Sequence, residues 1–185
     1  MSLTDINIRE KDFHNKLQSK KKGRFENIFY KAIYNCSEDF FKYLKNYAKD
    51  SFILDYGCGV GSFVKKVAEY NPEKITGIDI SEVSIEKAKK NTRELKIETE
   101  FKVENCEKTS FHDNSFDIVY GSGIIHHLQI EKSLDEILRI LKPDGNLLFI
   151  EPLGTNPIIN LYRKLTPKAR SIDEYPLVQN DLDYI

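Results

Sequence analysis

The sequence contains few cysteines, almost no net charge and no long apolar run. Its three cysteines, Cys36, Cys58 and Cys106, are odd in number and form no Cys-x-x-Cys pair. This argues against a disulfide framework or a zinc site and fits a reducing cytosol. The formal net charge of −1 gives no overall attraction to nucleic acid or to acidic membrane surfaces.

Hydrophobic segments of membrane length are also missing. No apolar run approaches the roughly 20 residues that cross a bilayer. The chain is polar from Thr4 onward, so we expect no signal peptide. We therefore predict a cytoplasmic protein with neither a membrane nor a nucleic acid as its partner.

The 185 residues suit one domain with a single core, preceded by two different N-terminal parts. Residues 1–24 are polar and end in a basic run, which predicts a solvated, partly mobile arm rather than a patch for an anionic partner. Over 25–50 apolar residues recur at helical spacing and predict a helical cap. We expect 51–156 to form the core and 157–185 a C-terminal segment.

Beyond residue 50 the pattern alternates between short apolar strands and amphipathic helices. This alternation predicts an α/β fold, a Rossmann-like, mostly parallel sheet with helices on both faces. Ser81 is the predicted N-cap of a helix that reaches about residue 96, and another helix ends at the turn 142–145. The predicted strands are 51–55, 74–79, 100–104, 116–120 and 146–151.

A glycine-rich loop directly follows the first predicted strand. Gly57, Gly59 and Gly61 let the backbone turn sharply and approach a ligand. The helix that opens after them directs free N–H groups at that ligand. The next strand ends at Asp79, whose carboxylate can accept both hydroxyls of an adenosine ribose. Together these features predict a ligand that contains adenosine.

The spacing also separates two kinds of adenosine ligand. A dinucleotide site has the pattern Gly-x-Gly-x-x-Gly, and its third glycine would fall on Ser62. Asp55, two residues before the first glycine, suits a cationic amino group and would repel a pyrophosphate. We therefore predict adenosine joined to a group that carries an ammonium, and a nicotinamide-dependent oxidoreductase is disfavoured.

Taken in order along the chain, these motifs resemble those of class I (Rossmann-like) S-adenosylmethionine-dependent methyltransferases. The resemblance covers about residues 51–151 and rests on Asp55 to Gly61, Asp79 at a strand end, Phe116 to Val119, and Leu141 to Gly145. It implies S-adenosyl-L-methionine as cofactor and S-adenosyl-L-homocysteine as product.

The resemblance also implies which residues hold the cofactor. Asp55 and the loop would hold its methionine part, and two residues after the fourth strand would line the cleft near the reacting sulfur. The loop residues are Gly57, Cys58, Gly59 and Gly61, and the cleft residues are Gly121 and Ser122.

The remaining implied contacts concern the adenosine. Asp79 would bind the ribose hydroxyls, and Ile80 would pack on the adenine. Asn105 stands where the family usually has aspartate and keeps an oxygen that can accept from the adenine amino group. The backbone N–H of Cys106 would lie beside it.

Two adjacent histidines, His126 and His127, follow the fourth predicted strand, on the side where parallel sheets bind ligands. A methyl group on a sulfonium is already activated, so the protein mainly aligns the acceptor and removes its proton. Histidine suits proton removal at neutral pH, and in similar family members a histidine recurs at the position of His127. We predict His127, then His126, as catalytic; the alternative is that both only pack at the cleft floor.

Three further sequence features have mainly structural interpretations. Asp117, at the start of the fourth strand, is more readily a structural carboxylate than a catalytic one. No metal site is expected, because adjacent histidines diverge and His14 and His112 are distant in sequence. The family fold normally closes with two more strands, which we expect to be missing or shortened in an incomplete or lid-like C-terminal segment. Candidate acceptor contacts there are Tyr162, Arg163 and Arg170.

We therefore predict methyl transfer from S-adenosylmethionine to a small molecule whose identity the sequence leaves open. One alternative is a protein or nucleic-acid acceptor. Another is a non-catalytic adenosyl-binding module that works through protein contact. The sequence predicts no particular oligomeric state.

Overall fold

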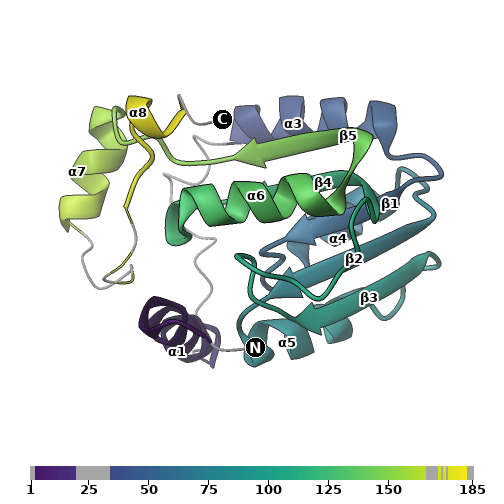
Figure 1. Ribbon diagram of the computed structural model, residues 1–185, viewed down its shortest axis with the longest axis horizontal. Helices are drawn as coiled ribbons and strands as arrows, with labels where there is room; N and C mark the ends of the chain where they lie inside the picture. Colours follow the sequence, from purple (N-terminus) through teal and green to yellow (C-terminus); the bar gives the residue numbers. More distant parts are fainter. Residues whose placement is uncertain (1–2, 20–33, 166–170, 172, 174, 183–185) are drawn as a thin grey trace.

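The computed structural model describes residues 3–19, 34–165, 171, 173 and 175–182, and its centre is a parallel sheet (Figure 1). The strands lie in the order β3-β2-β1-β4-β5, and every neighbouring pair is parallel. The chain therefore adds strands on one side of β1 and then on the other, which creates a switch point between β1 and β4. The strands are β1 (Phe52–Tyr56), β2 (Lys74–Asp79), β3 (Glu98–Val103), β4 (Phe116–Ser122) and β5 (Leu141–Ile150).

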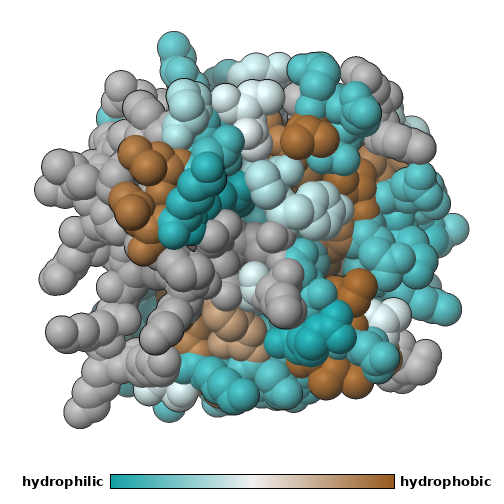
Figure 2. Space-filling model, turned by 90° about the vertical axis from the view of Figure 1, so that its left-hand side faces the viewer, coloured by the Kyte–Doolittle hydropathy of each residue, from teal (hydrophilic) through white to brown (hydrophobic). Residues whose placement is uncertain are grey.

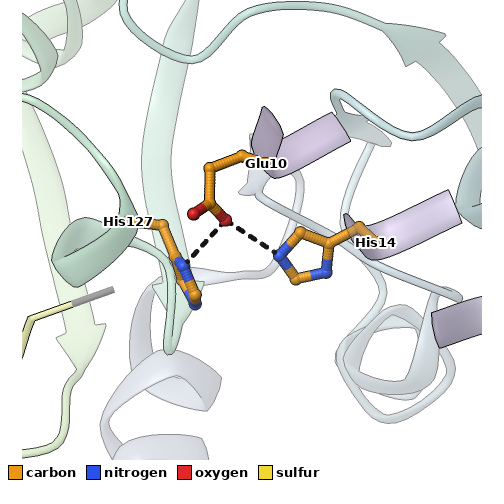
Figure 3. Close-up of side chains that lie close together, drawn as sticks. All are labelled: Glu10, His14 and His127. Atoms are coloured by element: carbon orange, nitrogen blue, oxygen red, sulfur yellow. Dashed lines mark ion pairs between the residues drawn. The ribbon is translucent and has the colours of Figure 1, made fainter. Parts of the chain in front are cut away.

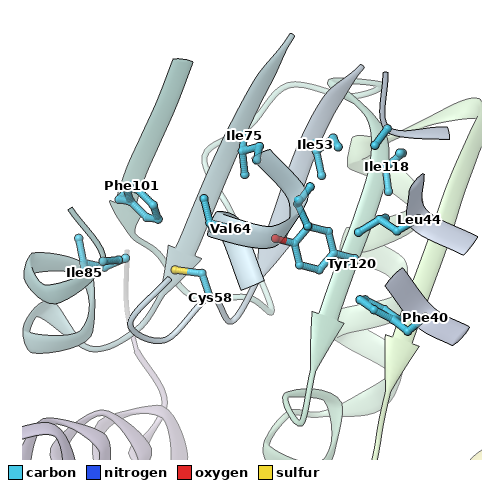
Figure 4. Packing of buried hydrophobic residues seen from close by; sticks show 13 residues of the cluster. Phe40, Leu44, Ile53, Cys58, Val64, Ile75, Ile85, Phe101, Ile118 and Tyr120 are labelled. Carbon is cyan, nitrogen blue, oxygen red and sulfur yellow. The ribbon is translucent and has the colours of Figure 1, made fainter. Parts of the chain in front are cut away.

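Helices cover both faces of this sheet. Successive strand residues point to opposite sides, and apolar residues on each side pack against helices. In β1, Ile53 packs into the apolar cluster under α3, α4 and α5, which Figure 4 shows from close by. Its neighbour Leu54 packs into the second cluster, under α6. The helices are α3 (Tyr34–Tyr47), α4 (Ser62–Ala68), α5 (Glu82–Thr92) and α6 (Ile130–Ile140), with a short 3₁₀ turn η2 (Ile125–His127) after β4.

The predicted α/β fold is confirmed, and the first four predicted strands lie within two residues of the observed ones. Ser81 is the N-cap of α5, and its Oγ accepts a hydrogen bond from the Ser84 N–H at 3.1 Å. The bounds of β5 include the predicted turn 142–145, but these residues pair with no other strand. Leu141 pairs with Phe116 of β4, and pairing resumes at Asn146, where the fifth strand was predicted to begin.

The prediction of a solvated, partly mobile arm is wrong for the part of residues 1–24 that the structure describes. Residues Asp5–Ser19 form helix α1, in which Asn7 and Glu10 are buried. Thr4 and Asn7 exchange hydrogen bonds at its start, with Thr4 Oγ1 accepting from the Asn7 N–H at 3.2 Å. α1 packs against α5 and lies at the carboxyl edge of the sheet (Figure 1). The basic run 20–24 and residues 25–33 of the expected cap lie outside the described residues.

The described part of the chain after β5 contains two helices, α7 (Pro157–Leu165) and α8 (Gln179–Leu182), and no further strand beyond an isolated bridge between Leu153 and Leu177. Tyr175 ties this segment to η2, since its N–H donates to the His126 carbonyl at 3.3 Å. Of the predicted acceptor contacts, Arg163 lies in α7 and is buried. Arg170 and the side chain of Tyr162 lie outside the described part.

On the side where α1, α7 and α8 lie, hydrophobic residues form separate patches between hydrophilic ones (Figure 2). Scattered exposed apolar side chains are ordinary on protein surfaces. Among the described helices, none combines the length and the apolar character needed to cross a bilayer. The exposed large apolar side chains of the C-terminal elements are Leu153, Leu161, Leu165, Tyr175 and Val178.

Candidate active site

The glycine loop after β1 lies at the switch point between β1 and β4. Gly57 and Gly59 have left-handed φ angles of 75° and 52°. A Cβ on Gly57 would come within 2.6 Å of the Ile124 side chain, whereas a Cβ on Gly59 would meet nothing within 4 Å. The first glycine thus lets the loop pass the chain after β4, and the second borders open space. The Gly61 N–H closes the turn by donating to the Cys58 carbonyl at 2.9 Å.

The chain after β4 comes against this loop, as the parallel pairing of the two strands requires. A Cβ on Gly121 would lie only 2.8 Å from the Tyr56 carbonyl oxygen. Ser122, the last residue of β4, is exposed beside it. The structure therefore brings together the residues predicted to hold the methionine part and those predicted to line the cleft.

Asp55, in β1 just before this loop, is a buried acid. Only 4% of the residue is exposed, and its Oδ2 has no hydrogen-bond partner in the described part of the chain. Burial raises the pKa of Asp55 to about 7; the nearby Tyr120 hydroxyl lowers it and Asp79 raises it further. A buried polar atom without a partner is costly, so this oxygen is suited to a ligand that brings a positive charge.

Asp79 lies at the end of β2, where the sequence predicted it. Its Oδ2 accepts from the Gly59 N–H at 3.0 Å and its Oδ1 from the Ser81 N–H at 2.8 Å. Burial raises the pKa of Asp79, while these two bonds and the nearby His14 and His127 lower it. A carboxylate has about four acceptor positions, so two bonds leave room for two hydroxyl donors. Ile80 follows directly and is partly exposed.

Asn105 and Cys106 are both buried in the loop after β3. Asn105 Oδ1 accepts from the Glu107 N–H at 3.0 Å, and its Nδ2 donates to Asn7 of α1 at 3.1 Å. The Cys106 carbonyl accepts from the Tyr56 hydroxyl, and burial raises the pKa of its thiol. The predicted adenine contacts therefore lie under α1.

The two predicted catalytic histidines have different surroundings. His126 Nδ1 lies 2.7 Å from Glu151 Oε2, and Glu151 Oε1 accepts the N–H groups of Ile124 and Ile125. His126 is thus paired with the residue that follows β5, and the same carboxylate accepts from the two residues before His126. His127 is also buried, but its Nδ1 lies 3.1 Å from Glu10 Oε2 of α1 (Figure 3).

Charge and burial act in opposite directions on the Glu10–His127 pair. Burial lowers the pKa of His127, and Glu10 only partly offsets this, so the imidazole is neutral at neutral pH. Burial raises the pKa of Glu10, but His127, His14 and the Ser171 hydroxyl lower it by more and keep the group ionised. The pair therefore places a neutral imidazole beside a carboxylate where α1 meets η2.

Sequence reasoning missed the contribution of α1 to this site. Asn15 Oδ1 accepts from the Ser81 hydroxyl at 2.5 Å, and Lys11 pairs with Glu82 on α5. Glu10 and His14 lie one turn apart on the helix face that meets His127. The i, i+4 spacing of these two residues was the only signal in the sequence.

Distance in sequence was a poor guide to whether the histidines could form a metal site. His14 is distant from His127 in sequence, yet the two ring centroids lie 5.3 Å apart. Glu10, His14 and His127 form a group whose ligand atoms all lie within 4.8 Å of one another. His112, the other remote histidine, is exposed and lies outside this group.

The fold and the switch-point loop define a Rossmann-like, ligand-binding α/β domain. The chain belongs to the family described as "Methyltransferase domain", which matches residues 54–149. This confirms the predicted resemblance to class I, S-adenosylmethionine-dependent methyltransferases.

Individual relatives agree with this assignment. The chain is 33% identical over 193 residues to a demethylmenaquinone methyltransferase of Lactobacillus johnsonii, covering 95% of this chain and 78% of that protein. It is 33% identical over 117 residues to phosphoethanolamine N-methyltransferase 3 of Arabidopsis thaliana, covering 60% of this chain and 24% of that protein. An S-adenosylmethionine-dependent methyltransferase structure from Methanosarcina mazei matches with a TM-score of 0.63 at 27% identity, over 77% of this chain and 80% of that one. The chain thus spans about a quarter of the phosphoethanolamine enzyme.

Proposed function

We propose that the protein transfers a methyl group from S-adenosylmethionine to a small molecule. The observation that carries the proposal is Asp55, a buried carboxyl under the glycine loop whose Oδ2 has no partner among the described residues. The cofactor, when bound, supplies a methyl group on a positively charged sulfur. Its ammonium group would give Asp55 the cationic partner that it lacks.

The other residues around the loop fit the rest of that cofactor. Asp79 has free acceptor positions for the two ribose hydroxyls, with Ile80 next to it for the adenine. Asn105 and the Cys106 N–H would contact the adenine, and Gly121 and Ser122 would border the reacting sulfur. Two carboxyls near the loop oppose a pyrophosphate, which supports this ligand over a nicotinamide dinucleotide.

His127 is the proposed contact for the acceptor. It is neutral at neutral pH because of its burial, so it can take up a proton, and Glu10 faces its Nδ1 at 3.1 Å. A carboxylate in that position stabilises the imidazole once it is protonated. His126, fixed by Glu151, would hold the turn that carries His127 and act as a positioning residue.

A small-molecule acceptor is supported by the relatives. The names of two of them specify demethylmenaquinone and phosphoethanolamine as what those enzymes methylate.

Radioactive transfer measures this function directly. The purified chain is incubated with methyl-tritiated S-adenosylmethionine and a panel of small phenols, carboxylic acids and amines. We expect labelled product from at least one acceptor, its loss in Asp55→Asn, and its retention in Asp117→Asn, whose carboxylate lies elsewhere, paired with Lys142 at 2.7 Å. Binding of the cofactor without transfer to any panel member, but with transfer to protein or RNA, would contradict the small-molecule proposal.

A further inference from the structure

Three side chains that can ligate a metal ion meet where α1 closes over the turn after β4 (Figure 3). Glu10 and His14 lie one helical turn apart on α1, and His127 comes from η2. Glu10 Oε2 lies 3.1 Å from His127 Nδ1 and 3.5 Å from His14 Nε2. One carboxylate oxygen and two imidazole nitrogens therefore face a common point.

These separations match those between the ligands of a bound transition metal. Zinc–nitrogen and zinc–oxygen bonds of about 2.1 Å place tetrahedral ligand atoms about 3.4 Å apart. Two of the three ligand separations, 3.1 and 3.5 Å, already agree with this. All three ligand atoms lie within 4.8 Å of one another, and His14, which supplies the third, is partly exposed.

Burial gives a second and independent indication. Glu10 is 5% exposed and His127 is 9% exposed. Glu10 Oε2 and His127 Nδ1 are both buried without a well-formed hydrogen bond, although they face each other. Buried polar atoms are seldom left in this state. A cation between them would satisfy both atoms at once.

Neighbouring groups already hold the ligands in place, as partners behind metal ligands do. The Ser171 hydroxyl donates to Glu10 Oε1, the carboxylate oxygen other than the one near the two imidazoles. The His126 ring lies against the His127 ring, with centroids 4.2 Å apart.

We propose that Glu10, His14 and His127 bind one divalent transition-metal ion of the zinc class. Two imidazoles and a carboxylate are ligands that such ions accept, and three protein ligands leave a coordination position open. The ligands carry one negative charge in total, so the loaded site keeps a positive charge that favours an anionic oxygen. The substrate class is therefore an acceptor with a carboxylate, phenolate or similar oxygen.

Metal binding itself is independent of the proposed methyl transfer; only the assignment of the acceptor rests on it. The ion would join α1 to η2 and so fix the helix over the end of β2, which carries Asp79, and over the loop that carries Asn105. With the ion in place His127 is a ligand and not a base, and the metal's charge, not the imidazole, makes an acceptor hydroxyl easier to deprotonate.

Calorimetric titration of the whole chain with Zn²⁺, in the presence of a competing chelator, tests the site. We expect one ion per chain in the parent protein and in the control His112→Gln, whose exposed histidine lies outside the cluster. Glu10→Gln, His14→Gln and His127→Gln should each weaken binding by at least about tenfold, since altering even an outer partner of a metal site costs roughly 10–100-fold. Equal affinity in all variants, or no stoichiometric uptake, would overturn the proposal.

Two further measurements keep the outcome clear. Thermal melting by circular dichroism checks that each variant folds. If Glu10→Gln and His127→Gln, at buried residues, are unfolded, the result for His14→Gln decides the test, because His14 is partly exposed. Adding acetate to the Co²⁺-loaded chain should shift its visible spectrum, and an unchanged spectrum would refute the open position. Parallel titration with S-adenosylhomocysteine separates the two proposals. Zn²⁺ uptake without adenosyl binding would retain the metal site and reject the methyltransferase function. Adenosyl binding without Zn²⁺ uptake would retain the methyltransferase function and reject the metal site.

Discussion

Replacing Asp55 by asparagine should stabilise the cofactor-free protein while it removes the cofactor's anchor. The carboxyl is 4% exposed and lacks a partner for Oδ2 in the described part of the chain. Burial raises its pKa from 3.8 to about 7. The folded state therefore binds this proton more tightly than the unfolded state does. The stability that the protonated group contributes is complete below the unfolded pKa and is lost as pH rises through the folded pKa.

The size of the effect follows from the two pKa values. Each tenfold change in proton affinity is worth about 1.4 kcal/mol, so the ionised carboxylate costs on the order of 4 kcal/mol above neutral pH. Asparagine has nearly the same shape and carries no charge. We expect Asp55→Asn to match the parent in free energy of unfolding near about pH 4 and to exceed it by up to about 4 kcal/mol near about pH 8.

Urea denaturation across this pH range, without cofactor, measures the difference. Asp117→Asn is the control, and we expect it to change the free energy of unfolding in the opposite direction. Its carboxylate accepts from the Phe52 N–H at 2.9 Å and from Lys142 at 2.7 Å. Burial raises the pKa of Asp117, but Lys142 and the Phe52 N–H lower it by more, so the substitution should lose stability at neutral pH. If Asp55→Asn were equally destabilised at both ends of the range, the reasoning about an unpartnered carboxylate would be refuted.

Four other substitutions test the remaining parts of the site. Asp79→Ala should weaken S-adenosylhomocysteine binding by at least about tenfold, because each charge-assisted bond to a ribose hydroxyl is worth about 1.5–3 kcal/mol; an unchanged dissociation constant in calorimetry would remove Asp79 from the site. Gly57→Ala should cost about 1–3 kcal/mol in urea unfolding, because its φ is 75° and its Cβ would meet Ile124 at 2.6 Å. Gly59→Ala, with nothing within 4 Å, should cost less, and the reverse order would contradict the loop geometry. His127→Gln should lower turnover by about 10²–10⁴-fold with little change in cofactor affinity; full turnover with a lower melting temperature would mean that His127 only packs.

Much of the sheet and of the glycine loop could be predicted because their residues obey local rules. Ile53 and Leu54 are apolar on both sides of β1 since helices cover both faces. The hydroxyl of Ser81 caps α5 through a hydrogen bond to a residue only three positions further along the chain. Asp79 could be placed because it is the last residue of its strand, and open parallel sheets bind ligands at the carboxyl ends of their strands.

The part of the site that α1 supplies could not be predicted in the same way. The fully buried residues of α1 are Asn7 and Glu10, both polar, so burial on this helix does not follow its apolar residues. What fixes the helix is a set of long-range polar contacts, such as Asn15 with Ser81 and Arg9 with Asp173 at 2.8 Å. Contacts between residues so far apart leave no periodic trace in one sequence. For the same reason the proximity of His14 to His127 was missed.

Calorimetric titration of the purified chain with S-adenosylhomocysteine and, separately, with NAD tests the central claim most directly. The account predicts that one S-adenosylhomocysteine binds per chain, that Asp55→Asn weakens this binding by at least about tenfold through loss of a charge-assisted contact, and that NAD gives no binding heat. Binding of NAD without binding of S-adenosylhomocysteine would contradict it.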